Sequence, residues 1–363
     1  MSLPSLFQPA VVAGIALPNR LVMAPMTRRL SPEGVPGPDV AAYYRRRAEG
    51  GVGLIITEGT GIADAAALGE AGVPEFHGAA LDGWAKVITE VHAAGAKIMP
   101  QLWHVGGARR PALTATPDVP AVSPSGLFAP NEPNGEALTD SRIAAIIAAY
   151  GAAAAAAQRL GCDGIELHFA HGYLVDQFLW APTNERTDRW GQTPWLMAHE
   201  VVAECRRRTS PDYPICLRFS QWKQQDYNAR LYETPAQLEA FLKPMVDAGV
   251  DLFHCSTRRF WEPEFPGSRM NLAGWTRQLS GKPVITVGSV GLDEDFLVTR
   301  VGDDPLADGA RLELLEEMLA SGEIDLVAVG RALIGDPQWG DKMREGRFDE
   351  ITPFKRAALS SLD

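Results

Sequence analysis

No C-x-x-C pair occurs in this chain, and its only cysteines are Cys162, Cys205, Cys216 and Cys255. Zinc modules and iron–sulfur clusters need closely spaced cysteines, so neither ligand pattern is present. Isolated cysteines are typical of reduced thiols, and the first residues show no basic segment followed by an apolar one. We therefore expect a cytoplasmic protein.

Positive charge is also scarce, because 34 Lys and Arg stand against 45 Asp and Glu, a formal net charge of −11. The longest basic runs, at residues 45–47 and 206–208, end predicted helices, where positive charge suits the helix dipole. Nucleic acid binding needs clustered basic residues, so no such partner is expected. The longest apolar run, residues 143–157, is too short and alanine-rich to span a bilayer and predicts a helix packed on a sheet.

Short apolar segments alternating with helical patterns are abundant. Parallel strands buried on both faces are apolar throughout. Eight segments fit: 21–26, 53–58, 97–102, 164–167, 215–219, 252–256, 284–287 and 326–329. Helical patterns over residues 81–94, 141–160 and 235–248 each end before a glycine, which is typical of a helix C-terminus.

Eight alternating strand–helix units favour a closed (β/α)8 barrel over an open sheet. We expect the whole chain, residues 1–363, to form one domain with two inserted loops. Residues 106–135 (Gly106 to Gly135) follow the third strand and are rich in proline. Residues 257–278 (Thr257 to Gln278) follow the sixth strand and contain Phe260, Trp261 and Phe265. Both loops are expected at the barrel mouth, and the aromatic residues predict a pocket wall.

The stretch GIELHFAHGYLVDQFL, residues 164–179, follows its predicted strand with His168, His171 and Tyr173. Functional groups of such barrels gather at the carboxyl ends of the strands, so these three rings are the first candidates for chemistry. One alternative is a metal-dependent hydrolase or lyase with His168 and His171 as ligands. Barrel metal sites collect ligands from several strands, and no completing set is evident.

Polar residues also mark the ends of other strands. Gly288 ends the seventh strand, and Gly330 and Arg331 end the eighth. Barrels often bind phosphate between these two loops, so the pattern indicates a phosphate-bearing ligand. Arg218 lies in the apolar fifth strand, where a guanidinium needs an anion or acceptor. Gln101, near the end of the third strand, offers both a donor and an acceptor.

Six motifs occur in a fixed order along nearly the whole chain. They are APMT at 24–27, ITEGT at 56–60, QLWH at 101–104, HFAHGYLVDQFL at 168–179, NERTDRWG at 184–191 and GRALIGDP at 330–337. Together they resemble the old yellow enzyme family of FMN-dependent ene reductases. No single motif is specific, whereas the ordered set is.

The resemblance implies FMN lying across the barrel mouth. The residues implied for its phosphate are Gly288, Gly330 and Arg331. The residues implied for its ring are Ala24, Pro25, Met26, Thr27, Gly59, Gln101 and Arg218. In this arrangement Arg218 stabilises negative charge on the reduced ring, Gln101 pairs with its pyrimidine edge, and Thr27 adjusts its potential.

The resemblance also implies the reaction: NADPH or NADH reduces the flavin, which reduces an activated C=C bond of an enone-type substrate. His168 and His171 are the implied donors to the substrate carbonyl oxygen, where negative charge builds as hydride reaches the β-carbon. Tyr173 is the implied proton donor to the α-carbon. A homodimer is implied as well.

The chain departs from the usual family pattern at three places. Gly107 stands where an arginine is common, with Arg109 and Arg110 displaced along the chain. The segment QTPW at 192–195 replaces the usual Asn-Arg, and Arg28-Arg29 follow Thr27. These changes concern substrate preference and dimer contacts rather than the flavin site.

Two further alternatives stay within flavin chemistry. A flavin-dependent amine dehydrogenase or demethylase is one, although relatives of that kind carry cysteine ligands for an iron–sulfur cluster. A flavin-binding sensor or carrier without turnover is the other. The presence of Tyr173 together with both histidines argues for an enzyme.

Overall fold

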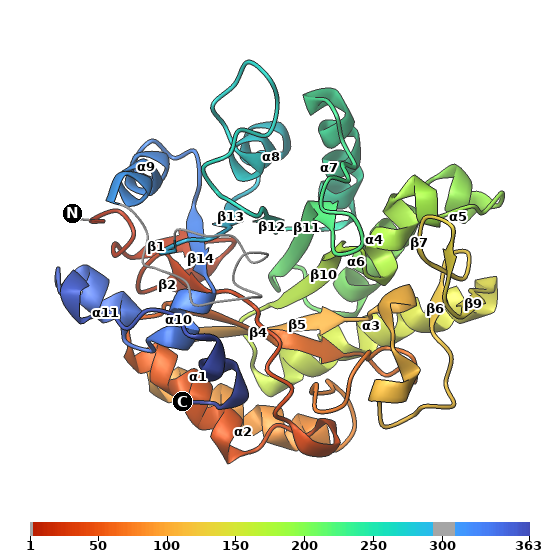
Figure 1. Ribbon diagram of the computed structural model, residues 1–363, viewed down its shortest axis with the longest axis horizontal. Coiled ribbons are helices and arrows are strands. Elements are labelled where there is room, and N and C mark those ends of the chain that lie inside the picture. The colour runs from red at the N-terminus through yellow and green to blue at the C-terminus, as the bar shows by residue number, and fades with distance from the viewer. Residues whose placement is uncertain (1–2, 293–308) are drawn as a thin grey trace.

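The computed structural model describes residues 3–292 and 309–363, and its centre is a closed barrel of parallel strands (Figure 1). The strands are β3 (Leu21–Met23), β4 (Leu54–Gly61), β5 (Lys97–Trp103), β10 (Ile165–His171), β11 (Ile215–Lys223), β12 (Leu252–Ser256), β13 (Val284–Val287) and β14 (Leu326–Val329). They pair in chain order, and β14 closes the barrel on β3 with Val327 opposite Leu21. The predicted (β/α)8 barrel is therefore confirmed.

Helices follow the strands and surround the barrel (Figure 1). They are α1 (Pro38–Glu49), α2 (Ala80–Ala93), α3 (Asp140–Leu160), α4 (Leu174–Leu179), α5 (Arg189–Gln192), α6 (Leu196–Arg208), α7 (Pro235–Ala248), α8 (Leu272–Ser280), α9 (Gly309–Ala320), α10 (Arg331–Gly335) and α11 (Trp339–Arg344). The α7 bounds agree with the prediction, because Thr234 and Gln237 form a capping box and Gly249 ends the helix at φ 115°. Among the described residues, short 3-10 helices lie at Pro32–Gly34, Gly106–Ala108, Pro111–Leu113, Ala181–Thr183, Phe348–Glu350 and Arg356–Ser360.

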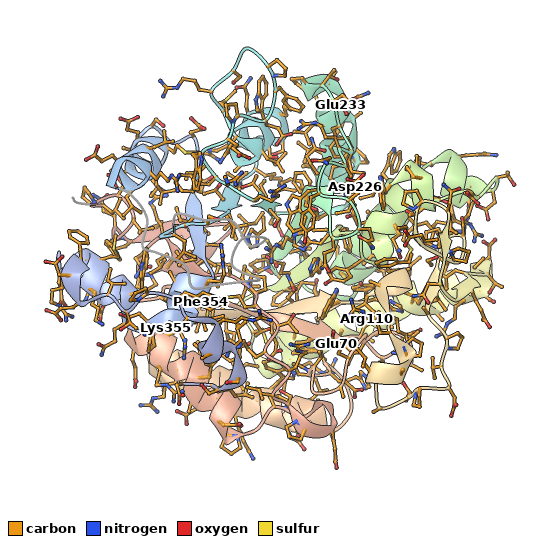
Figure 2. The ribbon with its side chains drawn as sticks, viewed as in Figure 1. Glu70, Arg110, Asp226, Glu233, Phe354 and Lys355 are labelled. Atoms are coloured by element: carbon orange, nitrogen blue, oxygen red, sulfur yellow. The ribbon has the colours of Figure 1, made fainter. Side chains whose placement is uncertain are left out.

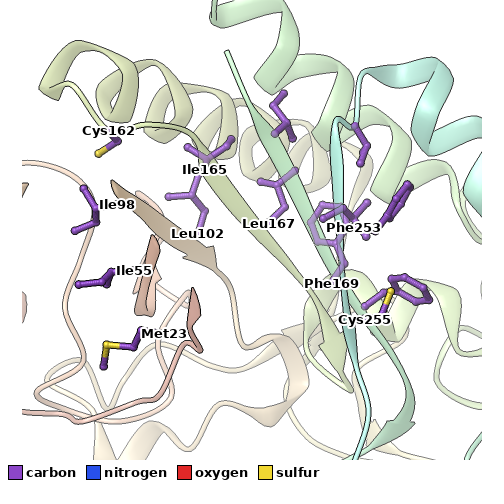
Figure 3. Packing of buried hydrophobic residues seen from close by; sticks show 14 of the residues in the cluster. Met23, Ile55, Ile98, Leu102, Cys162, Ile165, Leu167, Phe169, Phe253 and Cys255 are labelled. Carbon is purple, nitrogen blue, oxygen red and sulfur yellow. The ribbon is translucent and has the colours of Figure 1, made fainter. Parts of the chain in front are cut away.

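The core has two layers because alternate strand residues face opposite sides of the barrel wall. The outer layer, between strands and helices, includes Ile55, Leu167 and Phe253 (Figure 3). The inner layer includes Leu54, Cys216, Leu252 and Leu326 inside the barrel. The hairpin of β1 (Ala10–Val12) and β2 (Ile15–Leu17) packs its buried side chains into that inner layer beside the first strand residues. The hairpin therefore covers the amino-terminal end, and the carboxyl ends of the strands form the mouth.

Among the described residues, α3 is the one helix whose length and composition would allow it to cross a membrane. It packs against α6 and β5, with Ile143, Ile146 and Tyr150 fully buried. This packing confirms the prediction of a helix against the sheet.

The strand ends at the mouth differ from the prediction. The first strand stops at Met23, so Ala24 to Thr27 form a connection after it. By contrast, β4, β10 and β11 run on to Gly61, His171 and Lys223. His168 and His171 are thus part of a strand and not of the loop after it. Their polarity does not end the strand because both side chains are buried inside the mouth.

The two predicted insertions have different outcomes. Residues 106–135 hold β6 (Val122–Ser123), β7 (Leu127–Ala129) and β8 (Glu132–Pro133), and β9 (Glu136–Ala137) follows; these strands form two small sheets. The second predicted insertion, residues 257–278, is wrong at its end, because Asn271 caps α8 and the remaining residues belong to that barrel helix.

Two aromatic side chains of the second loop, Phe260 and Trp261, line a small cavity beside α9, together with Leu314 and Met318. Phe260 and Phe265 are buried in the outer core. The ring of Trp261 lies under the guanidinium of Arg311 from α9, 3.9 Å from ring centroid to Cζ. The rings of this loop therefore pack against the outer helices and border a cavity there, and a wall at the barrel mouth stays a prediction.

Candidate active site

The closed parallel barrel brings the predicted site residues to one end of the molecule, because all its strands end at the mouth. Strand register places His168 beside Arg218 and Arg218 beside His254. Gly330 lies next to the connection after β3, since a Cβ there would be 3.4 Å from Sδ of Met26 and 3.9 Å from Cβ of Ala24. The first, fourth, fifth, sixth and eighth strands thus contribute to one neighbourhood.

The three polar rings predicted from the sequence form a real cluster. The ring centroids of His168 lie 5.0 Å from those of both His171 and Tyr173. Trp103, at the end of β5, stacks on His168 at 5.8 Å and meets Tyr173 edge-on at 4.8 Å. On the other side Trp222 stacks on His171 at 4.4 Å. Both tryptophans are side chains that the sequence reasoning did not select.

The pKa values of these rings suit hydrogen-bond donation by neutral groups. Burial, reinforced by the charge of Arg218, holds the pKa values of His168 and His171 well below the usual histidine range. Each imidazole is therefore neutral near pH 7 and carries one N–H. Burial raises the pKa of Tyr173 to about 12, against the effect of a hydrogen bond donated by Gln224 to its hydroxyl. Tyr173 consequently keeps its proton at neutral pH.

Arg218 and Gln101 are tied to a buried carboxylate that the sequence reasoning also missed. Glu166 accepts a hydrogen bond from Nε2 of Gln101 at 2.7 Å and lies 2.6 Å from Nδ1 of His254. Burial by itself would raise the pKa of Glu166, but His254, Arg218 and the hydrogen bonds lower it below its usual range. The carboxylate is therefore the interior counter-charge of Arg218. The sequence feature that could have identified Glu166 is its spacing of two residues from His168, which places both side chains on the inner face of β10.

Several of these buried groups have unused hydrogen-bonding atoms. Within residues 3–292 and 309–363, Nδ1 of His168 and Nε of Arg218 have no partner. Buried polar atoms are normally satisfied, so unsatisfied ones at a barrel mouth fit a bound ligand rich in acceptors. Gln101 gives its amide N–H to Glu166, which leaves its carbonyl oxygen as the acceptor for such a ligand.

The loops after β13 and β14 lie close enough to be hydrogen-bonded. Arg331 Nη2 donates to Oγ of Ser289 at 3.3 Å. Gly288 has φ 151°, and a Cβ there would lie 2.6 Å from Oγ1 of Thr257 and 2.9 Å from its carbonyl oxygen. Only glycine fits that backbone without displacement. The predicted phosphate residues Gly288, Gly330 and Arg331 therefore share one rim of the mouth.

The connection after β3 is held by a carboxylate beneath it. Glu58 accepts backbone N–H bonds from Arg28 at 2.8 Å and Arg29 at 3.2 Å, directly after Thr27. Burial raises the pKa of Glu58 to about 7. Gly59 follows it, and a Cβ there would lie 2.4 Å from the ring of Trp103. Gly59 is thus required by the packing of Trp103.

The arginines that depart from the family pattern have structural contacts. Buried Arg109 donates to the carbonyl oxygens of Thr116 at 2.8 Å and Val119 at 3.2 Å, which braces the insertion. Exposed Arg110 lies 3.9 Å from a carboxylate oxygen of Glu70, and Figure 2 shows the two side chains close together.

Comparison with known proteins identifies the family. The model of the NADH:flavin oxidoreductase / NADH oxidase family matches residues 5–350. The chain belongs to this family. The resemblance to the old yellow enzyme family, stated from the sequence motifs, is confirmed at the level of the family. The metal-dependent hydrolase alternative does not agree with this membership.

Individual relatives support the assignment over nearly the whole chain. A metal reductase of Desulforamulus reducens is 31% identical over 365 residues, covering 96% of this chain but 50% of the relative. An NADPH dehydrogenase of Halalkalibacterium halodurans is 31% identical, covering 92% of both chains. The structure of morphinone reductase has a TM-score of 0.79 at 27% identity and covers 99% of this chain and 93% of that one. The chain thus spans about half the length of some curated relatives and nearly all of others.

Proposed function

We propose that this protein reduces the activated C=C bond of α,β-unsaturated carbonyl compounds, using FMN and NADPH or NADH. The observation that carries the proposal is the convergence of His168, His171 and Tyr173, whose rings lie 5.0 to 6.4 Å apart beside Arg218. The cluster therefore offers neutral imidazoles and one protonated phenol; Nδ1 of His168 has no partner among the described residues, and Nε2 of His171 lies 2.8 Å from Oγ of Ser256. The morphinone reductase named above, a structural relative, is by its name also a reductase.

The proposed FMN site follows the mouth residues. We assign the phosphate to Gly288, Gly330 and Arg331, and the ring to Ala24, Pro25, Met26, Thr27, Gly59, Gln101 and Arg218. Bound there, FMN would supply the hydride chemistry, with NADPH or NADH as the reductant. Arg218 supplies fixed positive charge, and the Gln101 carbonyl oxygen accepts a hydrogen bond from the ligand.

The chain's own residues then handle the substrate carbonyl and the proton. The N–H groups of His168 and His171 hold the carbonyl oxygen while negative charge develops on it. Neutral imidazoles are needed because a bound cation would be costly beside Arg218. Tyr173 releases its proton to the α-carbon, and its high pKa ensures that the proton is present when needed. Trp103 excludes water from the side of His168, and Trp222 excludes it from the side of His171.

The experiment that tests this function uses purified FMN-loaded protein with NADPH and 2-cyclohexenone under anaerobic conditions. We expect cyclohexanone to form in proportion to the NADPH consumed. A parallel reaction is run in air. If NADPH is consumed only in that reaction and no cyclohexanone forms, the result would indicate an NADH oxidase-type activity instead.

A single domain over residues 1–363, a cytoplasmic location and a homodimer are parts of the same proposal. The closed barrel and the family membership support the first. Gel filtration with light scattering tests the oligomeric state, because a dimer has twice the 39.2 kDa chain mass.

A further inference from the structure

The turn that carries His171 and Tyr173 has an unusual backbone. His171 has φ 67° and Gly172 has φ 77°, so two consecutive residues lie in the left-handed region. A residue with a Cβ is disfavoured there, which means that the surrounding contacts must hold it. The strand register also shifts between Phe169 and His171, after which His171 lies opposite Lys223.

A fully buried ion pair lies directly beneath this turn. Nζ of Lys223, the last residue of β11, is 2.8 Å from Oδ1 of Asp176 on α4, and neither side chain is exposed to solvent. The second carboxylate oxygen, Oδ2 of Asp176, accepts the backbone N–H of Gly172 at 2.7 Å. The carboxylate therefore binds the residue that immediately precedes Tyr173.

The ammonium reaches the other side of the same turn. Lys223 Nζ donates to the carbonyl oxygen of Ser220 at 3.2 Å, and Oγ of Ser220 accepts the backbone N–H of His171 at 2.9 Å. The Lys223 backbone N–H bonds to the carbonyl oxygen of Asp226 at 3.0 Å, which ends β11 in a turn labelled at Asp226 in Figure 2. Gly172 is thus bonded directly to the Asp176 carboxylate, and His171 is linked to the Lys223 ammonium through Ser220.

A pair of opposite charges is an expensive way to fill a core. Desolvation of both ions offsets much of their attraction, and apolar side chains of similar volume often stabilise a protein as well or better. What an apolar pair lacks is directional hydrogen bonds to Gly172 and Ser220. Those bonds are the contribution of Asp176 and Lys223 that packing alone does not supply.

We propose that Asp176 and Lys223 are positioning residues, which fix the His171–Gly172 turn and so aim His171 and Tyr173 at the substrate. The inference rests on the proposed function of those two rings. It assigns to the pair no contact with substrate or cofactor. The charge of Lys223 has a second consequence, because together with burial, Arg218, His168 and His254 it lowers the pKa of His171.

Two double variants separate hydrogen bonding from packing and from charge. Asp176→Leu with Lys223→Met fills the space with apolar groups and removes the bonds to Gly172 and Ser220. Asp176→Asn with Lys223→Gln is neutral but keeps an acceptor for Gly172 and a donor for Ser220. Lys342→Met is the control, because its Nζ lies 2.7 Å from Oδ2 of Asp336 in a second, largely buried ion pair.

The first readout is the affinity of the FMN-loaded protein for 4-hydroxybenzaldehyde, measured from the change in the protein's visible absorption spectrum. The apolar variant should bind FMN as the parent does but lose about 100-fold in kcat/KM for 2-cyclohexenone, since a displacement near 1 Å has that effect. Its affinity for 4-hydroxybenzaldehyde should fall as well. The amide variant and the Lys342→Met control should stay within about threefold of the parent protein, which is less than 1 kcal/mol by the affinity scale.

The second readout needs neither cofactor nor turnover. In the cofactor-free protein, amide hydrogen exchange at His171 and Gly172 should be at least about tenfold faster in the apolar variant than in the amide variant. Equal exchange, or parent-like binding and turnover by the apolar variant, would overturn the proposal. Loss of FMN binding by the folded apolar variant would also overturn the proposal, because the ion pair would then support the whole site and not the His171–Gly172 turn in particular. If the parent protein reduces no enone while the exchange result holds, the proposed function fails and the positioning role survives.

Discussion

Replacing Glu166 by Gln should destabilise the barrel interior without changing its shape. The carboxylate is fully buried, lies 2.6 Å from Nδ1 of His254, accepts from Gln101 at 2.7 Å and faces the cation of Arg218. Removing a carboxylate that compensates a buried cation costs about 3–5 kcal/mol, because the cation is left uncompensated. Because Gln keeps an acceptor for Gln101, we expect the lower limit, about 3 kcal/mol.

The expected change in melting temperature follows from chain length. An unfolding entropy of about 2.1 cal/mol/K per residue gives about 0.8 kcal/mol/K for 363 residues. A loss of about 3 kcal/mol then lowers Tm by about 4 °C, measured by calorimetry on the cofactor-free protein. The exposed Glu136, changed to Gln, is the matched control and should leave Tm unchanged.

The pH dependence provides an independent check on the same carboxylate. The folded-state pKa of Glu166 is lower than its ordinary value of 4.5, so its ionised form stabilises the protein above pH 4.5. That contribution is lost as the pH falls through the lower folded-state pKa. The parent and the Glu166→Gln variant should therefore differ fully at pH 7 and converge in acid. Equal Tm at pH 7, or a difference that grows in acid, would refute the buried counter-charge.

Three further predictions concern the site. His168→Ala should lower kcat for 2-cyclohexenone by about 100-fold to 1,000-fold, as loss of an oxyanion donor does, and weaken 4-hydroxybenzaldehyde binding; unchanged values would remove His168 from this role. Tyr173→Phe should slow alkene reduction by about 100-fold or more in stopped flow but leave flavin reduction by NADPH intact, and an equal fall in both steps would disprove proton donation. Gly288→Ala should weaken FMN binding by fluorescence titration, because its Cβ would lie 2.6 Å from Oγ1 of Thr257, whereas parent-like affinity would place the phosphate elsewhere.

The sequence was sufficient to predict the barrel because parallel strands buried on both faces leave uninterrupted apolar runs. The bounds of β12, β13 and β14 agree with the prediction residue by residue. Prediction failed where strands carry polar side chains into the mouth, as β10 does to His171 and β11 does to Lys223. A buried polar residue there is satisfied by partners from other strands, so its polarity does not mark the strand's end.

The parts of the site that the sequence missed are pairs separated widely along the chain. Glu166 and His254 are 88 residues apart, and Asp176 and Lys223 are 47 apart. Their closeness depends on the barrel register, which no local pattern reveals. The cluster of rings in residues 168–173 could be predicted from the sequence because the end of a single strand carries all of them. The aromatic loop after β12 is harder to interpret from the sequence, since an outer-core aromatic and a pocket aromatic look alike there.

The most direct test of a flavin at the barrel mouth is the visible absorption spectrum of the purified protein, incubated with FMN and freed of unbound cofactor. We expect flavin bands that bleach on anaerobic addition of NADPH and return when 2-cyclohexenone is added. A protein that remains colourless after incubation with FMN would contradict the account.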